Sequence, residues 1–175
     1  MIVMKFGGTS VEDAAAIERA TAIVQSRRAE HPVVVVSALA KVTDQLQEMG
    51  EAAGRGDREQ ALQLARCLRE RHYNVAGELL GTGLFTQFHA ELESDFDSLE
   101  ELLRGIAAVG ELTPRTADHV LSFGEIISSK TVSAVFSLRG LDASLVDARE
   151  CILTDAIHTH ATPLQLRLIQ FPCVL

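Results

Sequence analysis

The chain has 175 residues, 47% of them apolar and 23% charged, and 24 acidic against 16 basic residues give a formal net charge of −8. This length is enough for one well-buried core. A surface for nucleic acid or for an anionic membrane needs clustered lysine and arginine, and no apolar run approaches the roughly 20 residues that span a bilayer, so both partner classes are excluded.

The first 36 residues predict a strand, a helix and a second strand. Ile2–Phe6 is a short apolar run that ends at Gly-Gly, which is typical of a buried strand. Thr9 or Ser10 is expected to cap the next helix, because Ser10 and Asp13 have the spacing of a capping box. Val33–Val36 consists of β-branched residues without polar alternation, which indicates a strand covered on both faces. Together these elements predict a βαβ unit.

A long helical region follows, and the turn at 81–83 divides it. Apolar residues at helical spacing form one stripe before this Gly-Thr-Gly turn and another after it, so a helical hairpin is expected. The next helix is expected to start at Thr116 or Asp118 and to run to about Leu138. Gly140 is then expected to end this helix, because glycine commonly terminates a helix at its C-terminal cap.

The remaining sequence predicts two more strands, at Ala143–Val146 and Cys151–Leu153. No internal repeat, low-complexity segment or linker interrupts the chain, so it is expected to form one α/β domain. Its cysteines are odd in number and far apart, without a CxxC pair. This pattern argues against a disulfide framework or a zinc site and favours a reducing cytoplasm.

The stretch KFGGTS, residues 5–10, combines features that favour a phosphate ligand. Glycines after a buried strand let the backbone approach a ligand closely. The start of a helix attracts an anion, and Lys5 adds a mobile positive charge at the carboxyl end of the strand. The alternative is a tight turn between strand and helix with an exposed lysine. Neither a Walker A loop nor a GxGxxG motif is present.

Two further segments are candidates for binding a small polar substrate. Ser37 and Thr43 lie after the second strand, where hydroxyls and backbone amides can orient a ligand; alternatively, this is an ordinary loop in which Thr43 caps the next helix. Glu125 lies among apolar residues of a later helix, so it is expected to be partly buried and to need a partner. That partner is either a substrate ammonium or a structural arginine or lysine. His158 and His160 lack a third ligand nearby, so no metal site is predicted.

The segments KFGGTSV, VVVVSALAKVTD, LSFGEIISSKTVSAVF and DASLVDARECILTDAIHTHATP together resemble the aspartokinases of the amino-acid kinase superfamily. These enzymes phosphorylate the β-carboxylate of aspartate with ATP. The resemblance covers Met1 to about Pro163. It implies an open, mainly parallel sheet with helices on both faces, a three-layer α/β/α arrangement, of which this chain is the N-terminal part.

The resemblance also implies a role for each motif residue. Lys5 would contact the transferring phosphoryl group, and Gly7, Gly8, Thr9 and Ser10 would cradle the ATP phosphates. Positioning and charge neutralisation dominate such a reaction, with Mg²⁺ held mainly through the nucleotide.

The substrate side of the implied site comes from the two later motifs. Ser37 and Thr43 would line the aspartate site, and Glu125 would hold the aspartate ammonium. No residue is assigned to a metal.

Aspartokinases continue beyond this point into a nucleotide-binding half with a Gly-Ser-Asp-type motif and a substrate-binding arginine, and usually into ACT regulatory domains. The chain stops at Leu175, and its tail, from about 164 to 175, departs from the family pattern. Residues 1–175 are therefore expected to be a single partial kinase domain. The alternative to an aspartate kinase is a non-catalytic module that binds a small amino acid or a partner chain. A sheet interrupted in this way is also expected to self-associate through its exposed edge.

Overall fold

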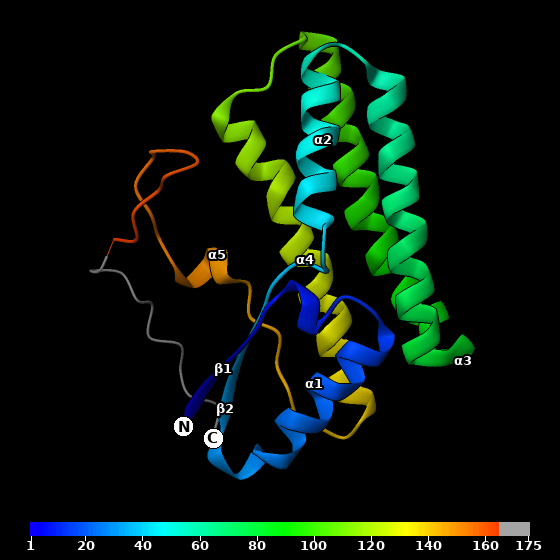
Figure 1. Cartoon of the computed structure of the whole chain (residues 1–175), viewed down its shortest axis with the longest axis vertical. Helices are drawn as coiled ribbons and strands as arrows, with labels where there is room; N and C mark the ends of the chain where they lie inside the picture. Colours follow the sequence, from blue (N-terminus) through cyan, green and yellow to red (C-terminus); the bar gives the residue numbers. More distant parts are fainter. Residues whose placement is uncertain (165–175) are drawn as a thin grey trace.

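The structure, a computed structural model, describes residues 1–164 (Figure 1). Residues 165–175, most of the divergent tail, lie outside the described residues. Within the described range, no helix combines the length and apolar character that a membrane crossing needs. The elements are β1 (Ile2–Phe6), η1 (Gly8–Ser10), α1 (Ala14–Ser26), η2 (Arg28–Glu30), β2 (Pro32–Val36), α2 (Val42–Gly54), α3 (Arg58–Val109), α4 (Pro114–Leu138) and α5 (Ala148–Cys151).

The two strands form a parallel sheet joined by α1. Phe6 at the end of β1 pairs with Val36 at the end of β2, so both strands finish at the same edge. Ile17 and Val24 of α1 are buried in the core. The βαβ unit predicted from the sequence is therefore confirmed.

One face of this sheet packs on the core, and the other lies open. Met4 and Val34 pack against the buried cluster. Val3 is 69% exposed, and Val33 and Val35 are 48% and 45% exposed. The expectation that the second strand is covered on both faces is therefore wrong for this part of the chain. Side chains alternate between the faces of a strand, and the helices of the described residues bury only one of these two sets.

The long helix α3 is a hairpin, as the sequence predicted. Gly81 has φ 67° and ψ 168°, a conformation open essentially to glycine, and it breaks the helix into two halves. Arg69 before the break pairs with Glu93 and Asp97 after it, each at 2.9 Å. Its guanidinium carbon also lies 5.6 Å from the centre of the Phe96 ring. Figure 1 shows the second half running back along the first.

Helix α4 begins at Pro114, earlier than the sequence predicted. Thr113 caps it, because its hydroxyl accepts the backbone N–H three residues later at 3.2 Å, and proline suits the first helical position. The helix ends at Leu138 as predicted, and Gly140 then takes a φ of 77°.

No strand forms between residues 141 and 164. The strands predicted at Ala143–Val146 and Cys151–Leu153 are wrong: the first is irregular with Leu145 47% exposed, and Cys151 ends the short helix α5. A single antiparallel bridge joins Thr154 to Pro163. An extended segment becomes a strand only by pairing with a neighbour, and among the described residues β1 and β2 pair with each other alone.

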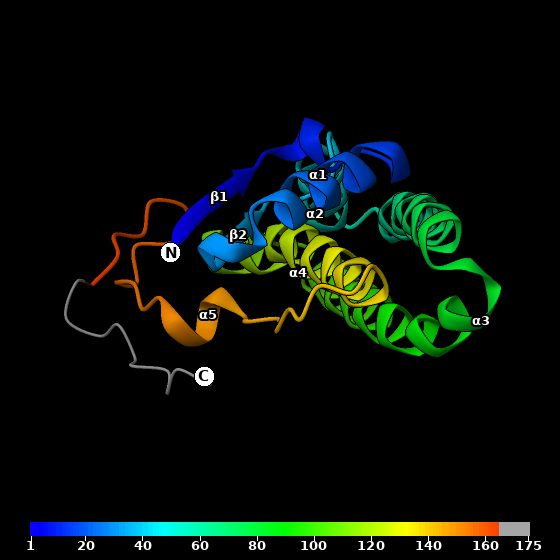
Figure 2. The same ribbon diagram turned by 90° about the horizontal axis from the view of Figure 1, so that it is seen from below.

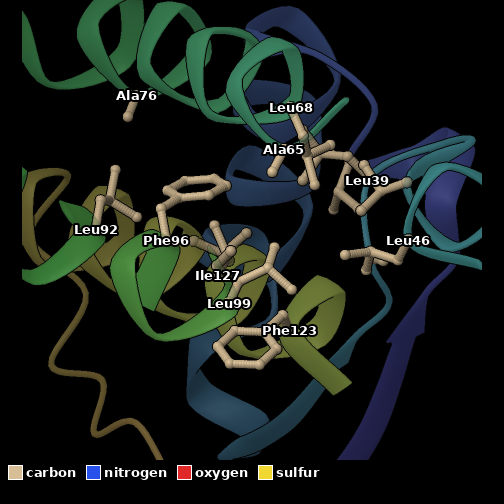
Figure 3. Close-up of a cluster of buried hydrophobic side chains, with 14 of the residues drawn as sticks. Leu39, Leu46, Ala65, Leu68, Ala76, Leu92, Phe96, Leu99, Phe123 and Ile127 are labelled. Atoms are coloured by element: carbon tan, nitrogen blue, oxygen red, sulfur yellow. The ribbon is translucent and has the colours of Figure 1, made fainter. Parts of the chain in front are cut away.

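The core lies between the helices and the inner face of the sheet. Figure 2 shows the sheet and the α3 hairpin at opposite ends, with α1, α2 and α4 between them. Figure 3 shows buried side chains from several of these elements in one cluster. Each large apolar side chain buried here contributes about 1.5–3 kcal/mol to stability. The fully buried members include Leu39, Leu46, Leu68, Phe96 and Ile127.

Candidate functional site

The carboxyl ends of β1 and β2 bring two of the sequence motifs side by side. Beyond the paired strand ends, the backbone N–H of Ser37 donates to the carbonyl oxygen of Phe6 at 3.1 Å. The loop after β1, residues 7–13, and the loop after β2, residues 37–41, therefore leave the sheet as neighbours. We call them the first loop and the second loop. Ligands of open α/β sheets bind at this edge.

The first loop contains a tight turn directly after the strand. Ser10 N–H donates to the carbonyl of Gly7 at 2.8 Å, and residues 8–10 form a single 3₁₀ turn. The amides of Gly8 and Thr9 make no hydrogen bond within residues 1–164. The first amides of a helical turn have no partner of their own, so this turn can offer both N–H groups to an anion.

The cap of α1 differs from the prediction. Asp13 caps the helix, because its Oδ1 accepts the N–H of Ala16 at 2.7 Å. Thr9 and Ser10 are exposed and make no side-chain hydrogen bond in the described part of the chain. A carboxylate thus already occupies the amino end of α1, and any anion site belongs to the turn at 8–10. Both hydroxyls are free to face a ligand.

Lys5 extends over this turn. A Cβ placed on Gly7 would lie 3.6 Å from the Lys5 Nζ. The Lys5 side chain is exposed, and no carboxylate among the described residues lies within ion-pair distance of it. The ammonium is therefore available to an anion bound at the turn.

The second loop packs directly against the first. A Cβ on Gly8 would lie 3.1 Å from the carbonyl oxygen of Ala38 and 3.4 Å from the Cα of Ala40. A side chain at residue 8 would push the second loop back by a few tenths of an ångström, so the second glycine of the motif favours the close approach of the two loops. Leu39 anchors the second loop by pointing into the core (Figure 3).

A left-handed residue ends the second loop. Lys41 has φ 67° and starts α2 without a side-chain cap. Thr43 lies in the first turn of α2, is exposed, and makes no side-chain hydrogen bond within the described range. The alternative that Thr43 caps this helix is therefore wrong. Its hydroxyl is free, and it follows the loop that holds Ser37.

The third motif, on α4, docks onto the second loop. The Oε1 of Glu125 accepts the N–H of Ala38 at 3.2 Å, and the hydroxyl of Ser128 donates to the carbonyl of Ser37 at 2.8 Å. Gly124 allows this approach, because a Cβ there would lie 2.8 Å from the Cβ of Ala38. Three of the four motif segments therefore converge on one edge of the sheet.

Glu125 differs from its prediction in environment. The residue is exposed rather than partly buried, and its partner is a backbone amide. No arginine or lysine within residues 1–164 forms an ion pair with it, so the structural ion pair considered from the sequence is not formed. One carboxylate oxygen remains to accept a hydrogen bond from a ligand.

The last motif contacts the start of α4 through His158 and Thr159. His158 Nδ1 approaches Asp118 Oδ2 at 3.3 Å, and the N–H of Thr159 donates to the same oxygen at 2.9 Å. These contacts hold the segment near the start of α4. The described residues contain no group of three or more side chains suited to a metal.

A surface hollow of about 530 Å³ lies along α3 between His89 and Glu101. Its lining residues follow one another along a single helix face, so it is a furrow and not an enclosed pocket. None of them belongs to either loop.

Sequence reasoning missed one residue at the site, Arg71 of α3. Its guanidinium donates to backbone carbonyls of both loops. It is one of many arginines in polar helical sequence, and only the tertiary structure distinguishes it from the others.

Known proteins resemble this chain over most of its length. The model of the amino acid kinase family matches residues 1–169. In Arabidopsis thaliana, chloroplastic aspartokinase 2 is 38% identical over 85% of this chain and 26% of its own length. Chloroplastic aspartokinase 3 of the same plant is 37% identical over 93% of this chain and 29% of its own length. The chain thus spans less than a third of the length of these relatives.

Solved structures of Escherichia coli aspartokinase III share the fold. The complex with lysine and aspartate has a TM-score of 0.79 and 26% sequence identity, covering 93% of this chain and 35% of that one. The complex with aspartate and ADP has a TM-score of 0.78 at the same identity. The α/β fold class expected from the sequence is therefore confirmed.

Proposed function

Because the chain belongs to the amino acid kinase family, we propose that it serves the aspartokinase reaction, the transfer of a phosphoryl group from ATP to the β-carboxylate of L-aspartate. The product is 4-phospho-L-aspartate, which opens the biosynthesis of lysine, threonine and methionine. Aspartokinases at 37% and 38% identity support this choice, as does the structural neighbour that holds aspartate and ADP.

The observation that carries the proposal is the convergence of three motif segments at one sheet edge. Gly8 packs closely against the second loop, and Glu125 reaches the same loop from α4 by accepting the N–H of Ala38. A donor phosphate on the first loop and an acceptor on the second would then be neighbours. Phosphoryl transfer needs this positioning more than covalent chemistry by the protein.

The first loop would hold the phosphoryl side. Its free amides and the Lys5 ammonium would bind phosphate oxygens, and Gly7, Thr9 and Ser10 would complete the cradle. The described residues offer no ligand cluster for a metal, so we propose that Mg²⁺ is held through the nucleotide. When bound there, Mg²⁺ neutralises phosphate charge.

The second loop and α4 would hold the aspartate. Ser37 and Thr43 would contact its polar groups, and the remaining oxygen of Glu125 would accept from its ammonium. A charge-assisted hydrogen bond of this kind contributes about 1.5–3 kcal/mol.

Titration of the ¹⁵N-labelled chain with aspartate and with MgADP tests this assignment. Aspartate should shift the amide of Ala38, and MgADP should shift those of Gly7 and Gly8. Glu125→Gln should weaken aspartate binding about ten- to a hundredfold and leave MgADP binding nearly unchanged. Lys5→Ala should weaken MgADP binding and leave aspartate binding nearly unchanged.

Glu91→Gln is the matched control, because Glu91 is an exposed carboxylate on α3. It should change neither titration. A wild-type chain that does not respond to MgADP, or a Glu125→Gln variant with unchanged aspartate affinity, would contradict the proposal.

A second candidate is a non-catalytic kinase-fold module that binds an amino acid or a partner chain. It is favoured by the open sheet face. We also propose that residues 1–175 form a partial kinase domain, because the chain covers 35% of the aspartokinase III structure. Incubation with MgATP, aspartate and hydroxylamine separates the candidates: accumulating aspartyl hydroxamate identifies an enzyme, and aspartate binding without it identifies the module.

The open face also supports self-association. Val3 and Val33 are exposed side by side on paired strands, and exposed apolar surface of this kind invites contact with another chain. Sedimentation should show dimers or larger species that Val3→Thr and Val33→Thr reduce. Val109→Thr is the control, because Val109 is 75% exposed at the end of α3. A clean monomer at all concentrations would refute the idea.

We also propose a reducing compartment, the cytoplasm, for this chain. Cys67 and Cys151 are free thiols in the structure. The curated plant relatives are chloroplastic, so fractionation of the source cells, with markers for each compartment, would decide the location.

A further inference from the structure

Arg71 extends from the first half of α3 to both loops of the site. Its Nη1 donates to the carbonyl oxygen of Ala40 at 2.9 Å, and its Nη2 donates to the carbonyl oxygen of Glu12 at 3.2 Å. Ala40 lies at the end of the second loop, directly before the left-handed Lys41. Glu12 lies at the end of the first loop, directly before the Asp13 cap. One guanidinium therefore joins the ends of both loops.

These two bonds require an arginine. The guanidinium is a planar fork whose donors point in fixed directions, whereas a lysine ammonium is a point charge on a flexible stem. No carboxylate of residues 1–164 forms an ion pair with Arg71. The side chain is thus not part of an ion-pair network of the hairpin, such as the one around Arg69.

The loops are consequently fixed to each other at two places. At one, Gly8 packs closely against the second loop, so that a Cβ there would lie 3.1 Å from the carbonyl oxygen of Ala38. At the other, Arg71 bridges the two loop ends. Two separated contacts fix a distance and an orientation, which a single contact does not.

We propose that Arg71 is a positioning residue, which sets the spacing between the phosphate-binding turn of the first loop and the substrate-binding second loop. The link to phosphoryl transfer rests on the proposed function. There, a misplacement of about 1 Å between donor and acceptor can cost a hundredfold in rate. The hydrogen-bonded bridge itself is a property of the chain without ligand.

Hydrogen exchange of the ligand-free chain tests the bridge. The reporters are the amides of Ser10 and Val11 in the first loop and of Ala38 and Val42 at the second, which are all hydrogen-bonded. Arg71→Gln should accelerate exchange at both loops by about ten- to a hundredfold, the range for losing hydrogen bonds to a charged donor. Amides of the core helices should exchange at the wild-type rate.

Two other variants sharpen this test. Arg71→Lys keeps the charge but cannot form the fork, so it should protect one loop at most. Arg66→Gln is the matched control: Arg66 lies on the same helix and is exposed, with a hydrogen bond only to Gln63 in the described structure. It should leave both loops unchanged. If Arg71→Gln does not fold, the comparison of loop exchange between Arg71→Lys and the wild-type chain tests the proposal by itself.

Unchanged exchange at the loops would overturn the proposal. Exchange accelerated equally at the loops and in the core would also overturn it, because replacing an arginine whose role is purely structural lowers stability everywhere. Full protection of both loops in Arg71→Lys would overturn it as well. MgADP binding tests the link to function: Arg71→Gln should lower the affinity for MgADP at least about tenfold. If the wild-type chain binds no MgADP, the proposed function fails, and the exchange result still decides the role of Arg71.

Discussion

Replacing Gly124 by alanine tests how closely α4 must approach the second loop. The new methyl group would lie 2.8 Å from the Cβ of Ala38, 3.2 Å from a methyl carbon of Leu46 and 3.4 Å from one of Val42. Leu46 and Val42 can adjust by small side-chain rotations. The Cβ of Ala38 is attached to the backbone, so the second loop itself must move.

Two opposing effects set the size of the change. Alanine in place of glycine within a helix stabilises by about 1 kcal/mol. Overpacking a filled core costs about 1–3 kcal/mol, and the clash with a backbone-attached atom favours the upper half of that range. The net expectation is a loss of about 1–2 kcal/mol, or roughly 2–8 °C in Tm for a chain of this size. The displaced loop should also lose the bond from Ala38 N–H to Glu125.

Urea unfolding followed by circular dichroism measures this loss. Gly105→Ala is the control, because a Cβ at that helical position meets nothing within 4 Å, so it should stabilise by about 0.5–1 kcal/mol. Adding Ala38→Gly to Gly124→Ala removes the clashing methyl and should recover much of the loss. A Gly124→Ala chain as stable as the wild type, or a double variant without recovery, would refute the reasoning.

Two further predictions concern groups outside the site. Burial lowers the pKa of His72 to about 4 from 6.5, so the unfolded chain binds the proton first as the pH falls. The contribution of neutral His72 to the free energy of unfolding is fully present above pH 6.5. About 3 kcal/mol of it is lost as the pH falls from 6.5 to 4. Urea midpoints of a His72→Met variant should lack this slope, and an equal slope would contradict the assignment. Lys130 binds both carboxylate oxygens of Asp95, at 2.8 and 2.7 Å, in a partly buried pair. Asp95→Asn should therefore lower the free energy of unfolding by about 1–2 kcal/mol. Glu30→Gln, in the exposed pair with Arg27, should change it by less than about 0.5 kcal/mol. Equal losses in the two variants would contradict this prediction.

Elements specified by local sequence were predictable. The apolar run before Gly-Gly formed β1, which pairs with the next strand along the chain. The glycine at 81 broke the long helix and so formed the hairpin, because its backbone conformation is set by local sterics. Helix starts were less predictable, since Asp13 competed successfully with Thr9 and Ser10 as the cap of α1. Several good capping residues in a row leave the choice to the packing of the helix.

Features that depend on distant partners were not predictable. Ala143–Val146 has strand composition but no neighbour to pair with among the described residues. Glu125 was correctly singled out as a residue needing a partner, yet that partner is the backbone of a loop 87 residues away. Arg71 had no local signal at all, because its role depends on two carbonyl groups from other segments.

The sequence separations at the site have a consequence for the order of folding. The hairpin halves are joined by the turn at Gly81, so their contacts, such as Arg69 to Glu93, close short loops. The bond between Ser37 and Ser128 instead closes 91 residues. Long closures cost more entropy and are slow. We therefore expect the hairpin to form before α4 docks, and the candidate site to be assembled only when α4 has emerged and docked.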